Sequence, residues 1–197
     1  MEPQKDLLGA LHRDFWAYAS MILSPGAKRS LENGCRNAGV PAPMRASPPG
    51  AVGPALFLRV LRVASAKAGE DFVRHAGYFS GANAARGFEA NLKSPNAGAA
   101  RLAAAFHEAC PSLGLEASAP SPGRLEVRLT ADRPIEPALA AYARGFLRGA
   151  ARRLNEGSLP TIRERWRGGA RVWSATVLWN ARAPAGTSTR AERKRRK

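Results

Sequence analysis

The side chains that could ligate a metal are few in this sequence. His107 and Cys110 stand three residues apart, which is the spacing of half a zinc site. The other cysteine, Cys35, has no histidine or cysteine partner nearby in the sequence, so no second pair completes four-coordinate binding. We therefore expect neither a structural metal nor a disulfide framework.

Catalytic groups are equally hard to assemble. The sequence has no Gly-x-Ser-x-Gly nucleophile turn and no Ser-x-x-Lys pair, and neither phosphate-binding glycine motif occurs between a strand and a helix. The carboxylates of Glu70, Asp71, Glu89 and Glu108 are better explained as helix caps and partners of arginines than as an acid and base pair. The prediction is that the chain is not an enzyme.

Arginine is the residue type with a definite pattern. Arg144, Arg148 and Arg152 recur every four residues, which places them on one face of a helix. The C-terminal cluster adds Arg193, Lys194, Arg195 and Arg196. Such a ridge and tail suit phosphates and predict salt-sensitive binding of nucleic acid or another polyanion. A solvated face that keeps the protein in solution explains the same arginines equally well.

Composition sets wider limits. The 197 residues carry 31 Lys and Arg against 15 Asp and Glu, a formal net charge of +16. This length suffices for one domain with its own apolar core. Charged residues interrupt the first twenty positions, and no apolar run reaches the length of a membrane span. We expect a cytoplasmic protein with a single domain over residues 1–180 and a disordered basic tail over residues 181–197.

Helical periodicity dominates the first part of the chain. It predicts helices over residues 7–23, 24–35, 56–68 and 70–92, and Ser94-Pro95 predicts one more that ends before Pro111. Residues 40–54 hold too many prolines for regular structure and are expected to form a loop. Within residues 70–92, Gly77 and Gly81 indicate either close packing or a break near Ser80.

The period then changes to alternation. Residues 125–129 read as a half-buried strand, residues 139–154 as a long helix, and residues 162–166 and 172–179 as a hairpin closed by Gly168-Gly169. We therefore predict an α+β domain with about five helices packed on a small antiparallel sheet.

With this order of elements, residues 70–179 resemble the superfamily that joins heme nitric-oxide-binding domains, bacterial 4-vinyl-reductase-like domains and related Golgi-transport subunits. The resemblance rests on residues 71–79, Phe106-His107 before Pro111, residues 125–129 and residues 142–149. It is closest to the paralogues of this superfamily found in myxobacteria. It implies a non-catalytic sensory or scaffolding role, and a homodimer, since related domains commonly pair.

The resemblance also implies a pocket between the helices and the sheet for an apolar or flat small molecule. The side chains expected to line it are Phe72, Phe79, Phe106, His107, Tyr142, Phe146 and Trp173, with Trp179 beside them. Aromatic residues on inward faces more often simply pack in the core, and this interpretation is stronger than that of a ligand pocket.

Heme is what the heme-binding branch of the superfamily would hold. In that branch a histidine near the end of a helix ligates the iron, and a Tyr-x-Ser-x-Arg motif holds the propionates. His107 and Arg133 stand in plausible places, but Leu129 and Ala131 replace the tyrosine and the serine. A lone histidine is more often a packed or capping residue. The expectation is therefore no cofactor, with heme through His107 as the less favoured alternative.

Overall fold

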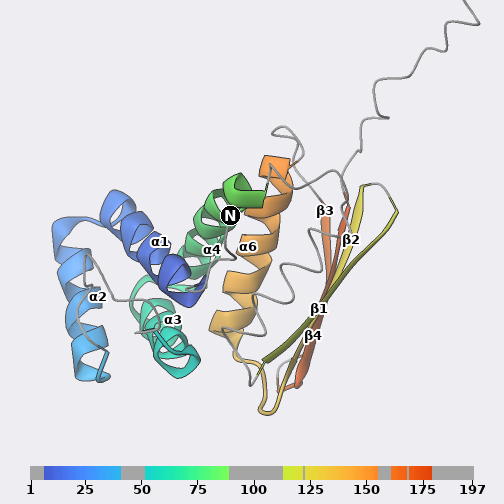
Figure 1. Cartoon of the computed structure of the whole chain (residues 1–197). Coiled ribbons are helices and arrows are strands. Elements are labelled where there is room, and N and C mark those ends of the chain that lie inside the picture. Colours follow the sequence, from blue (N-terminus) through green and yellow to red (C-terminus); the bar gives the residue numbers. More distant parts are fainter. Residues whose placement is uncertain are drawn as a thin grey trace, which may run out of the picture.

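The computed structural model of the chain describes residues 7–40, 52–88, 113–121, 123–154, 161–167 and 169–178. Five helices and four strands lie in this part of the chain (Figure 1). The helices are α1 (Leu7–Ile22), α2 (Pro25–Asn37), α3 (Pro54–Ala68), α4 (Glu70–Phe88) and α6 (Pro137–Leu154). The strands are β1 (Leu113–Ser121), β2 (Arg124–Ala131), β3 (Thr161–Arg165) and β4 (Val172–Leu178). The predicted α+β class is confirmed.

The helix boundaries follow the signals in the sequence. Ser24 caps α2 by accepting a hydrogen bond from the Ala27 amide at 3.3 Å, and Pro25 occupies the first helical turn. Helix α3 begins at Pro54 and ends at Ala68, and its C-cap Gly69 has a φ of +88°, a conformation that L side chains rarely adopt. The helix predicted over residues 56–68 is confirmed.

The sheet is antiparallel throughout, in the order β1-β2-β4-β3. Alternation in β2 buries Val127 and Leu129 while Arg128 and Thr130 stay exposed, as the pattern predicts. The hairpin of β3 and β4 is also confirmed, with Ile162 opposite Val177.

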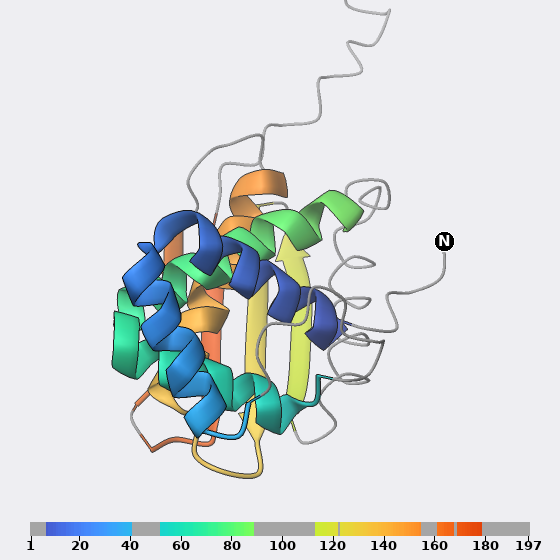
Figure 2. The ribbon, with the colours of Figure 1, turned by 90° about the vertical axis from the view of Figure 1, so that its left-hand side faces the viewer.

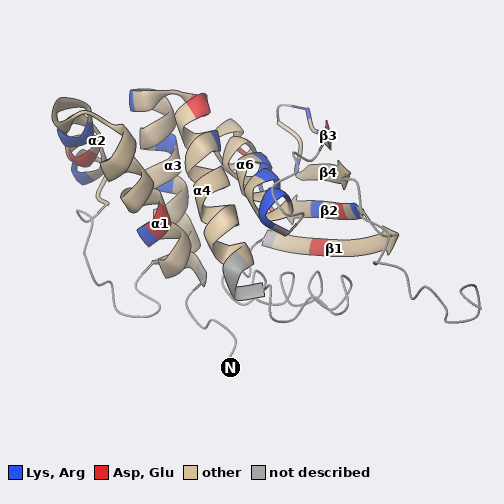
Figure 3. Cartoon of the chain, turned by 90° about the horizontal axis from the view of Figure 1, so that it is seen from above, with Lys and Arg blue, Asp and Glu red and all other residues tan. Residues whose placement is uncertain are grey.

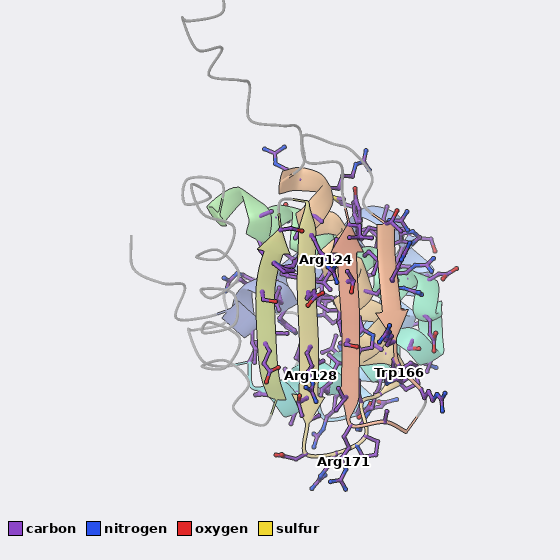
Figure 4. The ribbon with its side chains drawn as sticks, turned by 90° about the vertical axis from the view of Figure 1, so that its right-hand side faces the viewer. Arg124, Arg128, Trp166 and Arg171 are labelled. Carbon is purple, nitrogen blue, oxygen red and sulfur yellow. The ribbon has the colours of Figure 1, made fainter. Side chains whose placement is uncertain are left out.

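All described helices cover one face of the sheet (Figures 1 and 2). Helices α4 and α6 form the layer between the sheet and the group of α1, α2 and α3. The core follows these layers: Phe15 and Leu31 are buried among the outer helices, and Trp173 and Val177 beneath α6. The opposite face of the sheet is not covered by any described element (Figure 4).

One strand was missed and one expectation is wrong. Strand β1 was not predicted, because its sequence LGLEASAPS contains few of the β-branched and aromatic residues that are typical of a strand. The alternative of a break near Ser80 is wrong, because α4 runs without interruption from Glu70 to Phe88. The Ser80 hydroxyl donates to the carbonyl of Ala76 inside that helix, at 3.1 Å.

Several predictions lie outside the described residues. They are most of the loop over residues 40–54, the helix predicted after Ser94-Pro95, and the tail over residues 181–197. None of the described helices combines the length and the apolarity that crossing a lipid bilayer requires.

Candidate functional site

The aromatic residues predicted to line a pocket lie in different parts of the core. Phe72 and Phe79 on α4 both contact Tyr18 of α1, with ring centroids 5.5 Å and 5.9 Å apart. Tyr142 on α6 instead stands edge-on to Phe57 of α3, at 5.2 Å. Phe146 is half-buried against the same core. Phe106, His107 and Trp179 lie outside the described residues.

Trp173 lies on the sheet side of α6 and is 1% exposed. Its indole N–H donates to the Glu164 carboxylate, so this ring has a polar partner of its own. The other oxygen of Glu164 pairs with Arg144 at 2.8 Å. Trp173 is therefore anchored to β3 and α6 rather than grouped with Phe72 and Phe79.

Tyr142 carries the most unusual polar atom of the helical core. The residue is 4% exposed, and its hydroxyl has no hydrogen-bond partner among the described residues. The Ser80 hydroxyl lies near it and lowers the pKa of Tyr142, but the two hydroxyls do not reach hydrogen-bond geometry, and the Ser80 proton goes to the carbonyl of Ala76. Burial raises the pKa of Tyr142 strongly, and the charge of Asp14 adds to the rise. A neutral phenol held in this way is a hydrogen-bond donor without an acceptor.

Other polar groups of the helical core lie on α1 and α4. Asn83 donates to Asp14 at 3.0 Å, and burial raises the pKa of Asp14 in spite of that bond and of the nearby Arg13. The indole N–H of Trp16 donates to Nε2 of the buried His12 at 3.0 Å. These groups are satisfied, which sets the Tyr142 hydroxyl apart.

Arg133, the expected propionate partner, lines a surface groove of about 490 Å³ between α3 and the start of α6. Arg59 and Arg62 of α3 line the same groove. Arg62 forms a two-pronged ion pair with Glu136, so the groove keeps the positive charges of Arg59 and Arg133 beside the one carboxylate of Asp132. Cations of this kind suit the carboxylates of a flat cofactor.

The contact between α4 and α6 is made by four glycines. A Cβ on Gly77 would lie 2.2 Å from the carbonyl oxygen of Tyr142, and one on Gly145 would lie 1.9 Å from that of Arg74. Gly81 and Gly149 meet the opposite helix equally closely. The close-packing expectation for Gly77 and Gly81 is confirmed, since no side chain fits between these backbones.

The arginine ridge of α6 lies beside this contact. Arg144, Arg148 and Arg152 line one groove of about 710 Å³, to which α4 and the start of β3 contribute the other residues. Figure 3 shows basic positions in blue along α6. We call this the arginine groove; its charged and polar walls are Arg74, His75, Tyr78, Arg144, Arg148 and Arg152. The other phosphate-binding candidates, Arg193, Lys194, Arg195 and Arg196, lie outside the described residues.

The sequence indicated only the α6 half of that groove. Arg74, His75 and Tyr78 were missed as functional residues because nothing in the α4 sequence states which helix it faces. The signal that existed was the pairing of Gly77-x-x-x-Gly81 with Gly145-x-x-x-Gly149, which is typical of two helices in backbone contact.

In the described ranges, no group of three His, Cys, Asp or Glu side chains is placed to hold a metal ion. The buried thiol of Cys35 is a core residue, and burial raises its pKa to about 11. The ligand-like pair of the sequence, His107 and Cys110, lies outside the described residues.

No protein-family model matches this sequence, and no curated protein matches it. Solved structures do match, over nearly the whole chain. One is an H-NOX domain from a study of heme distortion, with a TM-score of 0.60 and 11% identity, covering 94% of this chain and 98% of that one. Another is an oxygen-binding H-NOX domain related to soluble guanylate cyclases, with a TM-score of 0.59, 11% identity and coverage of 91% and 95%. A mutant of the T. Tengcongensis H-NOX has a TM-score of 0.56, 12% identity and coverage of 89% and 97%.

The expectation of no cofactor is contradicted by this finding, because heme is the group studied in the H-NOX structures that share the fold. The described residues meet part of what a heme requires. Arg133 and its groove offer cations, and the Tyr142 hydroxyl offers a donor. Leu129, which replaces the tyrosine of the propionate motif, is 2% exposed in the core, and Ala131 has no hydroxyl.

The order of the elements, the single-sided packing of the helices and the match to these structures agree with the resemblance seen in the sequence. Identity this low speaks for the fold alone. The chain has the fold of the H-NOX domains.

Proposed function

We propose that this chain is a non-catalytic sensory domain that binds a small ligand within its helical core. The fold supports a ligand-binding role, because the domains that share it include an oxygen-binding protein. The scarcity of catalytic motifs in the sequence supports the non-catalytic part. The predicted homodimer and cytoplasmic location stay predictions.

The observation that carries the proposal is the Tyr142 hydroxyl. Leaving a buried hydroxyl without a partner costs about 1–3 kcal/mol, and such groups are rare in native proteins. A ligand with a hydrogen-bond acceptor would remove that cost on binding. The buried ring of Phe57 on α3, which stands edge-on to Tyr142, suits the apolar part of such a ligand.

Heme is the first ligand to test. In this proposal Arg133 pairs with a heme carboxylate and His107 ligates the iron. Heme iron would supply the site at which a diatomic gas binds. The Tyr142 hydroxyl would donate a hydrogen bond to a small ligand held there and would help to orient it. The loss of two of the three residues of the propionate motif, at Leu129 and Ala131, predicts weaker heme retention than a complete motif would give.

The test is an absorbance spectrum together with native mass spectrometry of the purified full chain, before and after incubation with hemin. A Soret band that His107→Ala abolishes and Arg133→Gln weakens supports the heme form of the proposal. His75→Ala is the matched control, because His75 is an exposed histidine on α4 and should leave the band unchanged.

A bound apolar molecule without a Soret band supports the ligand-binding role and rejects heme. The proposal would be overturned if the purified chain carries no ligand and takes up no hemin. In that case hemin would also leave the melting temperature of the unaltered protein and of both variants unchanged.

A further inference from the structure

The arginine groove exists because the backbones of α4 and α6 touch. Gly145 abuts the carbonyl of Arg74, and Gly149 abuts that of Tyr78. This close approach brings side chains of α4 and side chains of α6 together along the edge of the contact. Arg74 and Tyr78 stand on one side, and Arg144, Arg148 and Arg152 stand on the other.

The groove holds more positive charge than its carboxylates balance. Arg144 pairs with Glu164 at 2.8 Å, and Arg74 pairs with Asp71 at 2.9 Å. Arg152 donates to the Tyr78 hydroxyl at 2.6 Å and lies 5.9 Å from the centre of that ring. Arg148, between Arg144 and Arg152, has no ion pair among the described residues. Like charges one helical turn apart repel, so an anion bound here would stabilise the helix.

The arrangement suits a chain of phosphates better than a single one. Residues four apart on a helix are separated by about 6 Å along its axis, so the three α6 arginines form a straight row of cations. Guanidinium groups bind phosphate oxygens in a two-pronged manner. Two aromatic rings line the groove: Tyr78 is engaged by Arg152 and is not free to stack on a base, and the other is the exposed imidazole of His75.

The positions of the exposed apolar side chains argue against a lipid membrane as the partner of the arginine groove. The large apolar side chains that are exposed in the described part of the chain are Met21 and Ile22. They lie at the end of α1, and α4 stands between α1 and α6 (Figure 1). A lipid surface would have to meet both apolar and basic residues on one face.

We propose that the arginine groove binds the sugar-phosphate backbone of a nucleic-acid strand without reading its bases. This activity is separate from the ligand proposed for the helical core, because Tyr142 faces α3 while Arg144, Arg148 and Arg152 are exposed on another face of α6. Arg148 makes the central phosphate contact.

The experiment is fluorescence anisotropy of a labelled single-stranded oligonucleotide of mixed sequence, titrated with the full chain over a series of salt concentrations. Arg148→Gln should weaken binding several-fold and reduce the slope of log K against log salt by about 0.7, the value for one phosphate contact. Arg29→Gln is the matched control. It removes the same charge from an exposed position on α2, remote from the groove, and should leave the slope unchanged.

Arg148 forms no ion pair in the described structure, so its replacement should not lower the melting temperature, and this is checked alongside. Equal loss of affinity in Arg148→Gln and Arg29→Gln would overturn the proposal, because net charge alone would then explain binding. So would a deletion of residues 181–197 that abolishes binding while Arg148→Gln has no effect. Displacement of the oligonucleotide by polyglutamate at equal charge concentration would assign the groove to an acidic protein instead.

Discussion

Gly81 of α4 and Phe146 of α6 are in backbone contact: a Cβ on the glycine would lie 2.0 Å from the Phe146 carbonyl oxygen. Atoms of the main chain cannot move aside as a flexible side chain can. The two helices would have to separate to admit even one methyl group.

We expect Gly81→Ala to destabilise the protein by about 3 kcal/mol, at the upper end of the range for overpacked cores. Urea denaturation measures the loss. Gly26→Ala is the control, because a Cβ at Gly26 meets nothing within 4 Å. That variant should be neutral or slightly stabilising. Equal stability of the two variants would contradict the close contact.

Tyr142→Phe should stabilise the ligand-free protein by about 1 kcal/mol, because it removes a buried hydroxyl that has no partner. The same change should weaken binding of any ligand that accepts a hydrogen bond there. Tyr18→Phe, at a half-buried tyrosine of α1, serves as the control for loss of a phenol. If Tyr142→Phe destabilises the empty protein instead, the hydroxyl has a partner and the ligand proposal loses its main support.

His12 should make stability depend on pH. Burial, and then the nearby charge of Arg13, lowers the pKa of His12 from its ordinary value of 6.5. The folded state therefore favours neutral imidazole, whose Nε2 accepts from Trp16. This contribution to stability is complete above pH 6.5 and is lost as the pH falls from 6.5 through the lowered value.

Chemical denaturation at a series of pH values from 7.5 to 5 measures that loss. In His12→Gln the amide oxygen can still accept from Trp16 but does not titrate in this range. That variant should lack the part of the pH dependence that begins at pH 6.5. The same slope in both proteins would show that another group is responsible.

Glu164 should matter more through Trp173 than through Arg144. Its side chain is 16% exposed, and it accepts from the buried indole N–H while it pairs with the exposed Arg144. Glu164→Gln keeps an oxygen acceptor for the indole and should cost less than about 1 kcal/mol, as exposed ion pairs do. Glu164→Ala leaves the indole N–H unsatisfied and should cost about 1–3 kcal/mol. Thermal unfolding followed by tryptophan fluorescence compares them.

Local patterns were enough to predict most of the described fold. The Ser24-Pro25 cap and the alternation of residues 125–129 each act within a few neighbouring residues, so the sequence indicates them directly. Strand β1 was not predicted because its pairing with β2 stabilises it, as where Leu115 lies opposite Leu129, and its own composition does not favour a strand.

The site was harder to predict because it depends on which faces meet. Arg144, Arg148 and Arg152 were recognisable from spacing within one helix, but their placement opposite Arg74 and Tyr78 required knowing that α4 and α6 touch. The pocket-lining set mixed residues that face α1, such as Phe79, with residues that face β3, such as Trp173. Periodicity identifies an inward face but does not say what lies inside it.

Four positions in this helix pair tolerate no side chain, so their glycines should be retained even where overall sequence identity is low. A chain that keeps this helix pair must keep Gly77, Gly81, Gly145 and Gly149, whatever happens to the surface arginines. Two such glycine pairs, set in the helix before the sheet and in the helix between its strands, therefore offer a way to find distant relatives by spacing where overall identity has been lost.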